Sequence, residues 1–162
     1  LHLSLRRQRQ MCIRDSLKSD SLPQQTLPAK SARIVRSGRH ATVVTYSAML
    51  HEALRAADNI KNDGYDIEIV DLRCIKPIDM STVLGSIART GRVLAIGEAF
   101  PWGGVTSEII SRISSEGFNL LDAPPARLNS LDTPIPYHPD LWRYHRPTAS
   151  SIEEELRKLI RE

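Results

Sequence analysis

The sequence predicts an α/β domain, with a mostly parallel sheet and helices on both of its faces. Short apolar runs alternate along the chain with longer segments of helical periodicity, and this order builds strand–helix–strand units. The clearest unit is residues 92–110, where an apolar run ends at Glu98, and where Gly103 and Gly104 open a helical stripe. A strand, a glycine-containing loop and a helix form the crevice at the strand ends of open α/β sheets.

Five short runs have the apolar or β-branched content expected of strands. They are residues 32–35, 41–46, 67–72, 93–96 and 126–128. Residues 37–40, Ser-Gly-Arg-His, lie between the first two runs and predict a hairpin turn that would pair them. Residues 133–147 contain four prolines, which predicts an ordered but irregular segment.

Four segments carry apolar side chains at helical spacing, and they have recognisable start or stop signals. The predicted N-caps are Ser47, Asp79 and either Ser150 or Ser151, and the predicted glycine stops are Gly64, Gly91 and Gly117. The sequence contains no internal repeat, and its length is that of a single domain.

We assign the domain to residues 27–162 and place residues 1–26 outside it. Residues 1–16 show neither helical nor strand periodicity, and RRQRQMCIRDS within them resembles translated sequencing adapter. We therefore expect a disordered, non-native leader with a Ser-, Gln- and Pro-rich linker behind it, so that the natural protein starts upstream. A basic interaction tail and an organellar transit peptide are the alternatives.

Composition narrows the class of protein and its partners. The chain is 41% hydrophobic and 25% charged, as in ordinary globular proteins, and no apolar run approaches the roughly 20 residues of a membrane helix. Residues 1–40 hold nine Lys/Arg and two Asp, a net charge of about +7. Because the formal net charge of the whole chain is +3, residues 41–162 are mildly acidic. We therefore expect neither nucleic acid nor a membrane as partner. Two cysteines do not make a disulfide framework, which favours a reducing compartment, the bacterial cytoplasm.

No single motif supplies an active site. Neither the phosphate-binding GxxxxGK(S/T) pattern nor the dinucleotide-binding GxGxxG pattern is present. Glu98 stands at a strand's carboxyl end, where an acid–base group would lie, but we favour hydrogen bonds to a neighbouring loop or a pair with Arg73. Gly103 and Gly104 could bind an anion at the helix start, and a tight turn with close packing is the favoured interpretation.

The histidines and the cysteine lack companions for catalysis or metal binding. His138 and His145 lie seven residues apart, with no further Cys or His at metal-site spacing. Cys74 lies beside Arg73 and Lys76, but no histidine base accompanies it in the sequence. The sequence thus predicts an α/β domain with no catalytic, cofactor-binding or metal-binding residues of its own.

Three motifs nevertheless occur in a specific order: DLR at residues 71–73 with Pro77 and Asp79 after it, Glu98 separated by four residues from a Gly-Gly pair, and LDAP at residues 121–124. In this order and spacing the chain resembles the C-terminal, transketolase-type domain of the β subunit of thiamine-diphosphate-dependent 2-oxo acid dehydrogenases. These are the decarboxylating components of the pyruvate, branched-chain 2-oxo acid and acetoin dehydrogenase complexes. The resemblance covers residues 27–160 and implies a three-layer α/β/α fold with a mostly parallel, mixed sheet of about five strands.

The resemblance also implies a function, cofactors and partners. The intact enzyme decarboxylates a 2-oxo acid on thiamine diphosphate and magnesium and passes the acyl group to lipoyl groups. Its cofactor and catalytic groups belong to an N-terminal domain and an α subunit, so this fragment is expected to bind no cofactor and to be inactive alone. The implied partners are the α subunit, a second β subunit, and the peripheral subunit-binding domain of the lipoyl acyltransferase core.

The site residues follow from the same resemblance. By its position in LDAP, Asp122 matches the acidic residue that docks the acyltransferase's binding domain, where opposite charges speed and orient the encounter. Glu98, Gly103 and Gly104 are expected to be structural or interface residues. The chain departs from the pyruvate-type pattern after Pro136, so the substrate stays open.

Two other interpretations remain. One is a free-standing, flavodoxin-like binding or regulatory module with a basic tail. The other is the C-terminal domain of another transketolase relative, such as deoxyxylulose phosphate synthase, against which the tail from LDAP to TPIPY argues.

Overall fold

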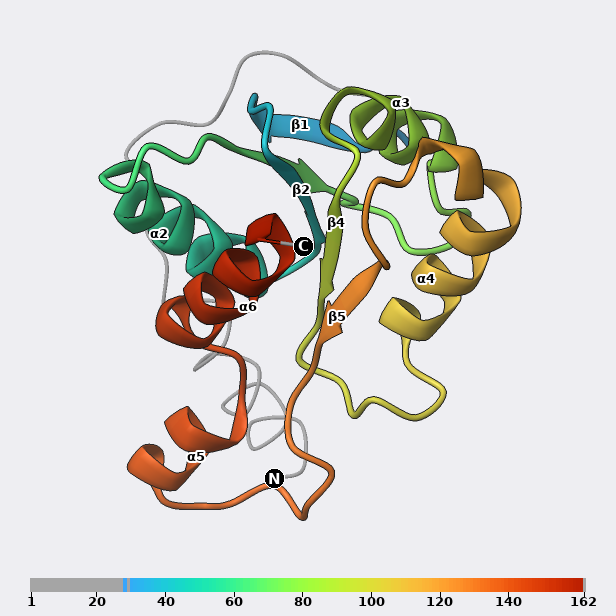
Figure 1. The fold of residues 1–162 in the computed structure, drawn as a ribbon. Coiled ribbons are helices and arrows are strands. Elements are labelled where there is room, and N and C mark those ends of the chain that lie inside the picture. Colours follow the sequence, from blue (N-terminus) through green and yellow to red (C-terminus); the bar gives the residue numbers. More distant parts are fainter. Residues whose placement is uncertain (1–27, 29, 162) are drawn as a thin grey trace.

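The computed structural model describes residue 28 and residues 30–161, so the leader assigned to residues 1–26 lies outside the described residues. One mixed sheet of five strands has the order β1-β3-β2-β4-β5 (Figure 1). The strands are β1 (Arg33–Arg36), β2 (Ala41–Thr45), β3 (Ile67–Asp71), β4 (Val93–Ile96) and β5 (Ala126–Leu128). β1 is antiparallel to β3, and the other neighbouring strands are parallel. The predicted mixed, mostly parallel sheet is confirmed.

The predicted hairpin between the first two strands is wrong, because β3 lies between β1 and β2. Every residue of β2 is buried, and a parallel strand borders it on each side. The link from β1 to β2 crosses the start of β3, where the N–H groups of Arg39 and His40 both donate to the Asp66 carbonyl at 3.0 Å. Gly38 permits this crossing, since a Cβ at that position would collide with the backbone of Ile67.

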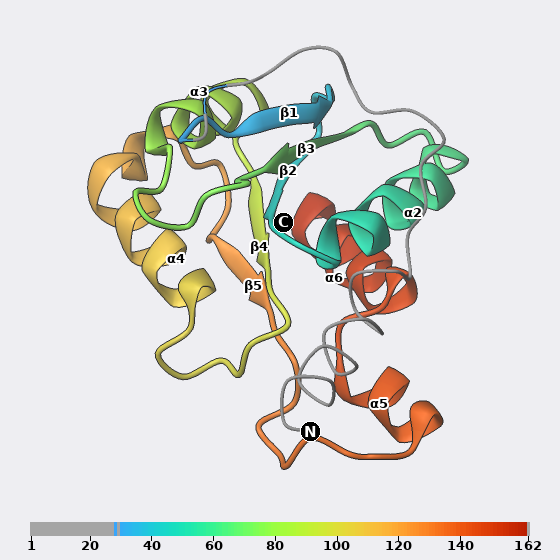
Figure 2. The same cartoon turned by 180° about the vertical axis from the view of Figure 1, so that it is seen from behind.

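Helices cover both faces of the sheet, giving the predicted three layers (Figures 1 and 2). One face is covered by α2 (Met49–Lys61) and α6 (Ala149–Arg161), and the other by α3 (Met80–Thr90) and α4 (Val105–Glu116). Each face has its own core: Ile60 and Leu156 pack in the first, and Ile87 and Ile113 in the second. None of the helices in the described part of the chain is long and apolar enough to cross a membrane.

Both ends of α3 are as predicted. The Asp79 carboxylate accepts a hydrogen bond from the Thr82 N–H at 3.2 Å, and Gly91 ends the helix with a φ of 66°. A hydrogen bond from the Ser81 hydroxyl, with others from Thr82 and the Ala32 N–H, holds the pKa of the Asp79 carboxyl well below its usual range.

Two other predicted caps are wrong. Ser47 has a left-handed φ of 58°, and Ala48 is the N-cap of α2. α6 starts directly after Thr148, so neither Ser150 nor Ser151 precedes it. The Thr148 hydroxyl accepts from the Ser151 N–H at 3.4 Å, and the Ser151 hydroxyl accepts from the Thr148 N–H at 2.9 Å. Thr148 therefore precedes the helix as its cap, and Ser151 is the third residue of α6, which bonds back to Thr148.

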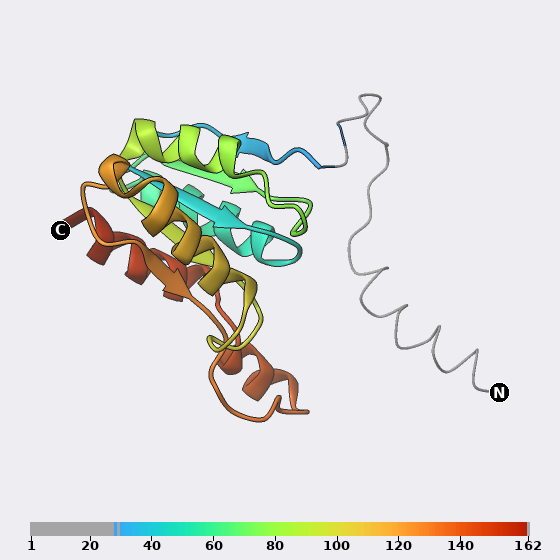
Figure 3. The ribbon, with the colours of Figure 1, turned by 90° about the vertical axis from the view of Figure 1, so that its right-hand side faces the viewer.

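Residues 133–147 are more regular than predicted. They contain α5 (Pro139–His145), whose first residue is a proline, which suits the first turn of a helix. The His138 ring accepts a hydrogen bond from the Asp140 N–H at 3.3 Å and so caps this helix. α5 projects beyond the carboxyl ends of the parallel strands (Figure 3).

Candidate functional site

The residues predicted to have a role lie at opposite ends of the sheet. Asp122 comes shortly before β5, and its N–H donates to the carbonyl of Gly91, which comes shortly before β4. Asp122 therefore lies at the amino ends of the parallel strands. Glu98, Gly103 and Gly104 follow β4 and lie at the carboxyl ends. The structure therefore forms two separate surfaces, the amino edge around Asp122 and the carboxyl edge around Glu98 and α5.

The end of α3 holds Asp122 at the amino edge. The Asp122 N–H donates to the Gly91 carbonyl at 2.7 Å, and the Asp122 carboxylate lies where a side chain on Gly91 would collide with it. Gly91 thus ends α3 and also leaves room for this carboxylate. The Asp122 side chain is 69% exposed, so its charge is presented to solvent from a fixed backbone.

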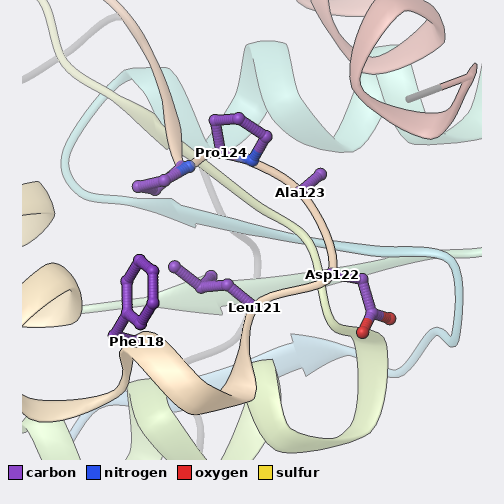
Figure 4. Close-up of a pocket in the computed structure, with 6 residues that line it drawn as sticks. Phe118, Leu121, Asp122, Ala123 and Pro124 are labelled. Carbon is purple, nitrogen blue, oxygen red and sulfur yellow. The ribbon is translucent and has the colours of Figure 1, made fainter.

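An apolar pocket of about 340 Å³ adjoins Asp122 (Figure 4). It is formed by the short 3₁₀ helix η1 (Phe118–Leu120) and the residues directly after it. Its lining residues are Phe118, Leu121, Asp122, Ala123, Pro124 and Pro125. The Asp122 carboxylate points away from the Phe118 ring, so the pocket has an apolar wall on one side and a negative charge at its rim (Figure 4). Such a site suits a partner that presents an apolar side chain close to a cation.

Arg92 is a residue of the amino edge that sequence reasoning missed. Its Nη1 lies 4.0 Å from the Asp122 carboxylate, and its Nε donates to the Leu159 carbonyl at 3.2 Å near the end of α6. Arg92 thereby connects α6 to the docking candidate Asp122. No local signal could identify it, because Leu159 is 67 residues away in the chain.

At the carboxyl edge, Glu98 does not pair with Arg73 as predicted. Glu98 lies 3.8 Å from the Arg146 guanidinium, whereas Arg73 donates to the carbonyls of Pro28 and Ser31 at 3.2 and 3.1 Å. Arg73 has a left-handed φ of 56° at the end of β3, and this turn directs the side chain toward the start of the domain.

Arg146 is the centre of a charged cluster at the carboxyl edge. It donates to the Glu52 carboxylate at 3.0 Å, and its guanidinium lies 4.2 Å from the centre of the Trp142 ring. Glu52 is only 6% exposed and also accepts from the Ala149 N–H at 3.1 Å. Burial, and then the negative charge of Glu98, raise the pKa of Tyr46. The cluster joins the link between α5 and α6 to α2 and contains no nucleophile–base pair.

The two glycines shape the loop between β4 and α4. Gly103 has a φ of 63°, which glycine adopts without strain, and Gly104 is the N-cap of α4. A Cβ on Gly104 would lie 2.8 Å from the Phe100 carbonyl oxygen. Ser107 of α4 and Arg127 of β5 both donate to the Pro101 carbonyl, at 2.9 and 2.8 Å, so this loop is fixed to both elements.

The remaining candidates stay apart. His138 is exposed, whereas His145 is buried with its ring 3.3 Å from the Thr133 hydroxyl. The Cys74 thiol donates to the Lys76 carbonyl at 3.3 Å. Over residues 30–161, no three His, Cys, Asp or Glu side chains are grouped so that they could hold a metal ion.

Comparison with known proteins identifies similar domains. The family model "Transketolase, C-terminal domain" matches residues 30–152. The "Pyruvate dehydrogenase E1 component subunit beta" of Gracilaria tenuistipitata is 37% identical and covers 91% of this chain and 45% of its own. The β-1 subunit of the mitochondrial pyruvate dehydrogenase E1 component of Arabidopsis thaliana is 38% identical over 78% of this chain and 35% of its own. The "Acetoin:2,6-dichlorophenolindophenol oxidoreductase subunit beta" of Cupriavidus necator is 36% identical, with shares of 83% and 40%.

This chain therefore spans less than half the length of the curated relatives that it matches. Among solved structures, a "Split gene transketolase, inactive beta4 tetramer" superimposes with a TM-score of 0.76 at 22% identity, over 90% of this chain and 46% of the other. At this identity the likeness concerns the fold, and it agrees with the three-layer arrangement and the five-stranded sheet.

Proposed function

Because the chain belongs to the transketolase C-terminal domain family, we propose that it is the assembly and docking domain of the β subunit of a 2-oxo acid dehydrogenase. The intact enzyme would oxidatively decarboxylate a 2-oxo acid with thiamine diphosphate and pass the acyl group to lipoyl groups. The names of the relatives, which are β subunits of pyruvate and acetoin enzymes, support this assignment. Its partners in the assembly would be an α subunit and a second β subunit.

The described residues offer no site for thiamine diphosphate at the amino edge and no three-ligand site for magnesium. They include no group of three acidic, histidine or cysteine side chains that could hold the metal. The pocket at the amino edge has apolar walls, and the charge at its rim, Asp122, would repel a diphosphate. We propose that other parts of the intact enzyme hold the cofactor, and we assign no step of the reaction to the described residues.

The docking part of the proposal is carried by one observation, the exposed Asp122 carboxylate beside an apolar pocket. The carboxylate is available to a partner, because its side chain is 69% exposed and Arg92 lies only at 4.0 Å. A basic subunit-binding domain of an acyltransferase core provides the opposite charge, and charge complementarity at an interface rim raises the association rate. The pocket beside it would receive an apolar side chain of the same partner.

The test measures binding of a purified peripheral subunit-binding domain to the full chain by titration calorimetry at low salt. Asp122→Lys replaces attraction by repulsion, and we expect it to weaken binding by about tenfold or more. The matched control is Asp132→Lys, the same change at an exposed position that follows β5, which should leave binding unchanged. Equal affinities of the Asp122→Lys and unmodified chains would refute the docking role.

A further inference from the structure

Arg92 places a positive charge beside the carboxylate at the pocket rim. Its Nη1 lies 4.0 Å from the Asp122 carboxylate, which is too far for a hydrogen bond but close enough for the two charges to attract each other. Among the described residues that line the pocket, Asp122 alone carries a charge. The rim of the pocket therefore presents a pair of opposite charges instead of a lone carboxylate.

Hydrogen bonds fix Arg92 at this position. Its backbone carbonyl accepts from the Thr42 N–H at 2.8 Å, which joins it to the start of β2. Its Nε donates to the Leu159 carbonyl at 3.2 Å, and that carbonyl lies too close to the end of α6 at Arg161 to be bonded within the helix. The negative end of the helix dipole also attracts the guanidinium. These interactions keep the charge of Arg92 near Asp122 when a partner approaches.

The two charges differ in how far they reach into solvent. The Asp122 side chain is 69% exposed, whereas the Arg92 side chain is only 25% exposed. Opposite charges so close together largely cancel at a distance, so they steer an approaching cation much less than a single charge would. A cation in contact with the rim still reaches the exposed carboxylate first. Arg92 therefore removes the long-range attraction of the site and leaves its attraction at contact.

We infer that Arg92 restrains docking at the amino edge: it slows the association of a basic partner and leaves the apolar pocket to hold that partner once it has arrived. The inference rests on the proposed function, which supplies a basic subunit-binding domain as the partner. A rim charge acts mainly on the association rate and its salt dependence, whereas contacts within the pocket act on the dissociation rate. Such a surface favours a partner that fills the pocket over a chain that offers charge alone.

Stopped-flow kinetics of a purified peripheral subunit-binding domain with the full 162-residue chain tests the inference. Arg92→Met removes the charge, and we expect association about three- to tenfold faster at low salt. The gain should shrink to less than about twofold at about 1 M salt, where the Debye length is about 3 Å. The matched control is Arg143→Met, which removes the same charge from α5 at the carboxyl edge and should leave the association rate within about twofold.

Two more variants of Arg92 separate its charge from its support of α6. Arg92→Gln is neutral but keeps an N–H donor, and it should accelerate association as Arg92→Met does. Arg92→Lys keeps the charge without the Nε bond to Leu159, so its association rate should return to within about twofold of the unmodified rate. Slower or unchanged association of the two neutral variants would overturn the inference, as would an equal acceleration by Arg92→Lys.

Phe118→Ser tests the share of the pocket. The Phe118 side chain is 72% exposed in the pocket wall, so its replacement should not disturb the core. We expect the subunit-binding domain to dissociate about tenfold faster from this variant, with little change in association. Unchanged dissociation would refute the part of the inference that assigns retention of the partner to the pocket.

The field at the rim can also be measured without a partner. The reporter is Phe118→Trp in a chain that carries Trp102→Phe and Trp142→Phe, since these are its two natural tryptophans. Iodide is an anion, so the lone carboxylate left by Arg92→Met should lower its quenching constant about twofold relative to that of neutral acrylamide. An unchanged ratio of the two quenching constants would contradict the cancellation of charges at the rim.

The unmodified chain separates the inference from the proposed function. If it binds the subunit-binding domain and the neutral variants associate no faster, the inference fails and the docking function stands. If neither the unmodified chain nor any Arg92 variant binds, the docking function is refuted and the inference falls with it.

Discussion

Replacing Gly91 by alanine tests how the amino edge positions Asp122. The added Cβ would meet the Asp122 carboxylate and would lie 3.1 Å from the Asp122 Cβ. Because Asp122 is held by its N–H bond to the Gly91 carbonyl, its backbone cannot move away easily. The carboxylate must therefore rotate into solvent, away from the place where it stands at the pocket rim.

Two costs determine the size of the effect. A left-handed conformation costs a residue with a Cβ about 1–2 kcal/mol, and Gly91 has a φ of 66°. Forcing the Asp122 side chain out of its preferred rotamer adds about 0.5–1.5 kcal/mol. We expect Gly91→Ala to lower the free energy of unfolding by about 1.5–3.5 kcal/mol in total. Gly103→Ala is the control, since Gly103 has a φ of 63° with nothing within 4 Å of its added Cβ, and only the first cost of about 1–2 kcal/mol applies.

Urea unfolding of both alanine variants, each with and without Asp122→Ala, isolates the contact. Removing the carboxylate should reduce the cost of Gly91→Ala to that of Gly103→Ala and should leave the cost of Gly103→Ala unchanged. Among the variants that keep Asp122, only Gly91→Ala should dock the subunit-binding domain more weakly, and every variant with Asp122→Ala should be weakened as well. A cost of Gly91→Ala that is the same with and without Asp122 would refute this account of the amino edge.

Two further predictions concern Arg146 and Asp79. Arg146→Met removes one of the two arginines that pair with the buried Glu52 carboxylate, the other being Arg55. Because Arg55 stays in place, we expect the loss of one charged hydrogen bond, about 2 kcal/mol in urea unfolding. Arg143→Met, at a side chain that is 73% exposed, should change stability by less than about 0.5 kcal/mol. The pKa of Asp79 is lower in the folded chain than in the unfolded chain, so its stabilisation is present above about pH 4 and declines as pH falls below that value. The difference in thermal stability between the unmodified chain and Asp79→Asn should therefore shrink from about pH 7 to about pH 3, and a constant difference would contradict the assignment.

Features encoded within a few residues were predictable from the sequence. Asp79 and Gly91 bracket α3 because a carboxylate cap and a left-handed glycine act within one turn of the helix. The helical segment after Gly104 was equally clear, since its signals lie close together in the chain. At α6 the capping pattern was recognised but its first residue was not, because Thr148 and Ser151 bond each other reciprocally.

Features that depend on distant residues were not predictable. Ser37-Gly38 suggested a hairpin between β1 and β2. The fully buried β2 lies at the centre of the sheet instead, and β3 pairs with β1 on one side and with β2 on the other. The ion pair of Arg146 with Glu52 joins residues 94 positions apart. Glu98 had a plausible partner nearby in Arg73, and only the left-handed turn at the end of β3 directs that arginine elsewhere.

The placement of the two edges has a consequence for the docking proposal. Asp122 and its pocket lie at the amino ends of the parallel strands, whereas Arg146 and Glu52 lie at the carboxyl ends. Changes at the two edges share no contact and should therefore act independently. Arg146→Met should lower the free energy of unfolding without weakening docking, and Asp122→Lys should weaken docking without changing the cost of Arg146→Met. Coupling between these two measurements would mean that a change at one edge alters the packing at the other.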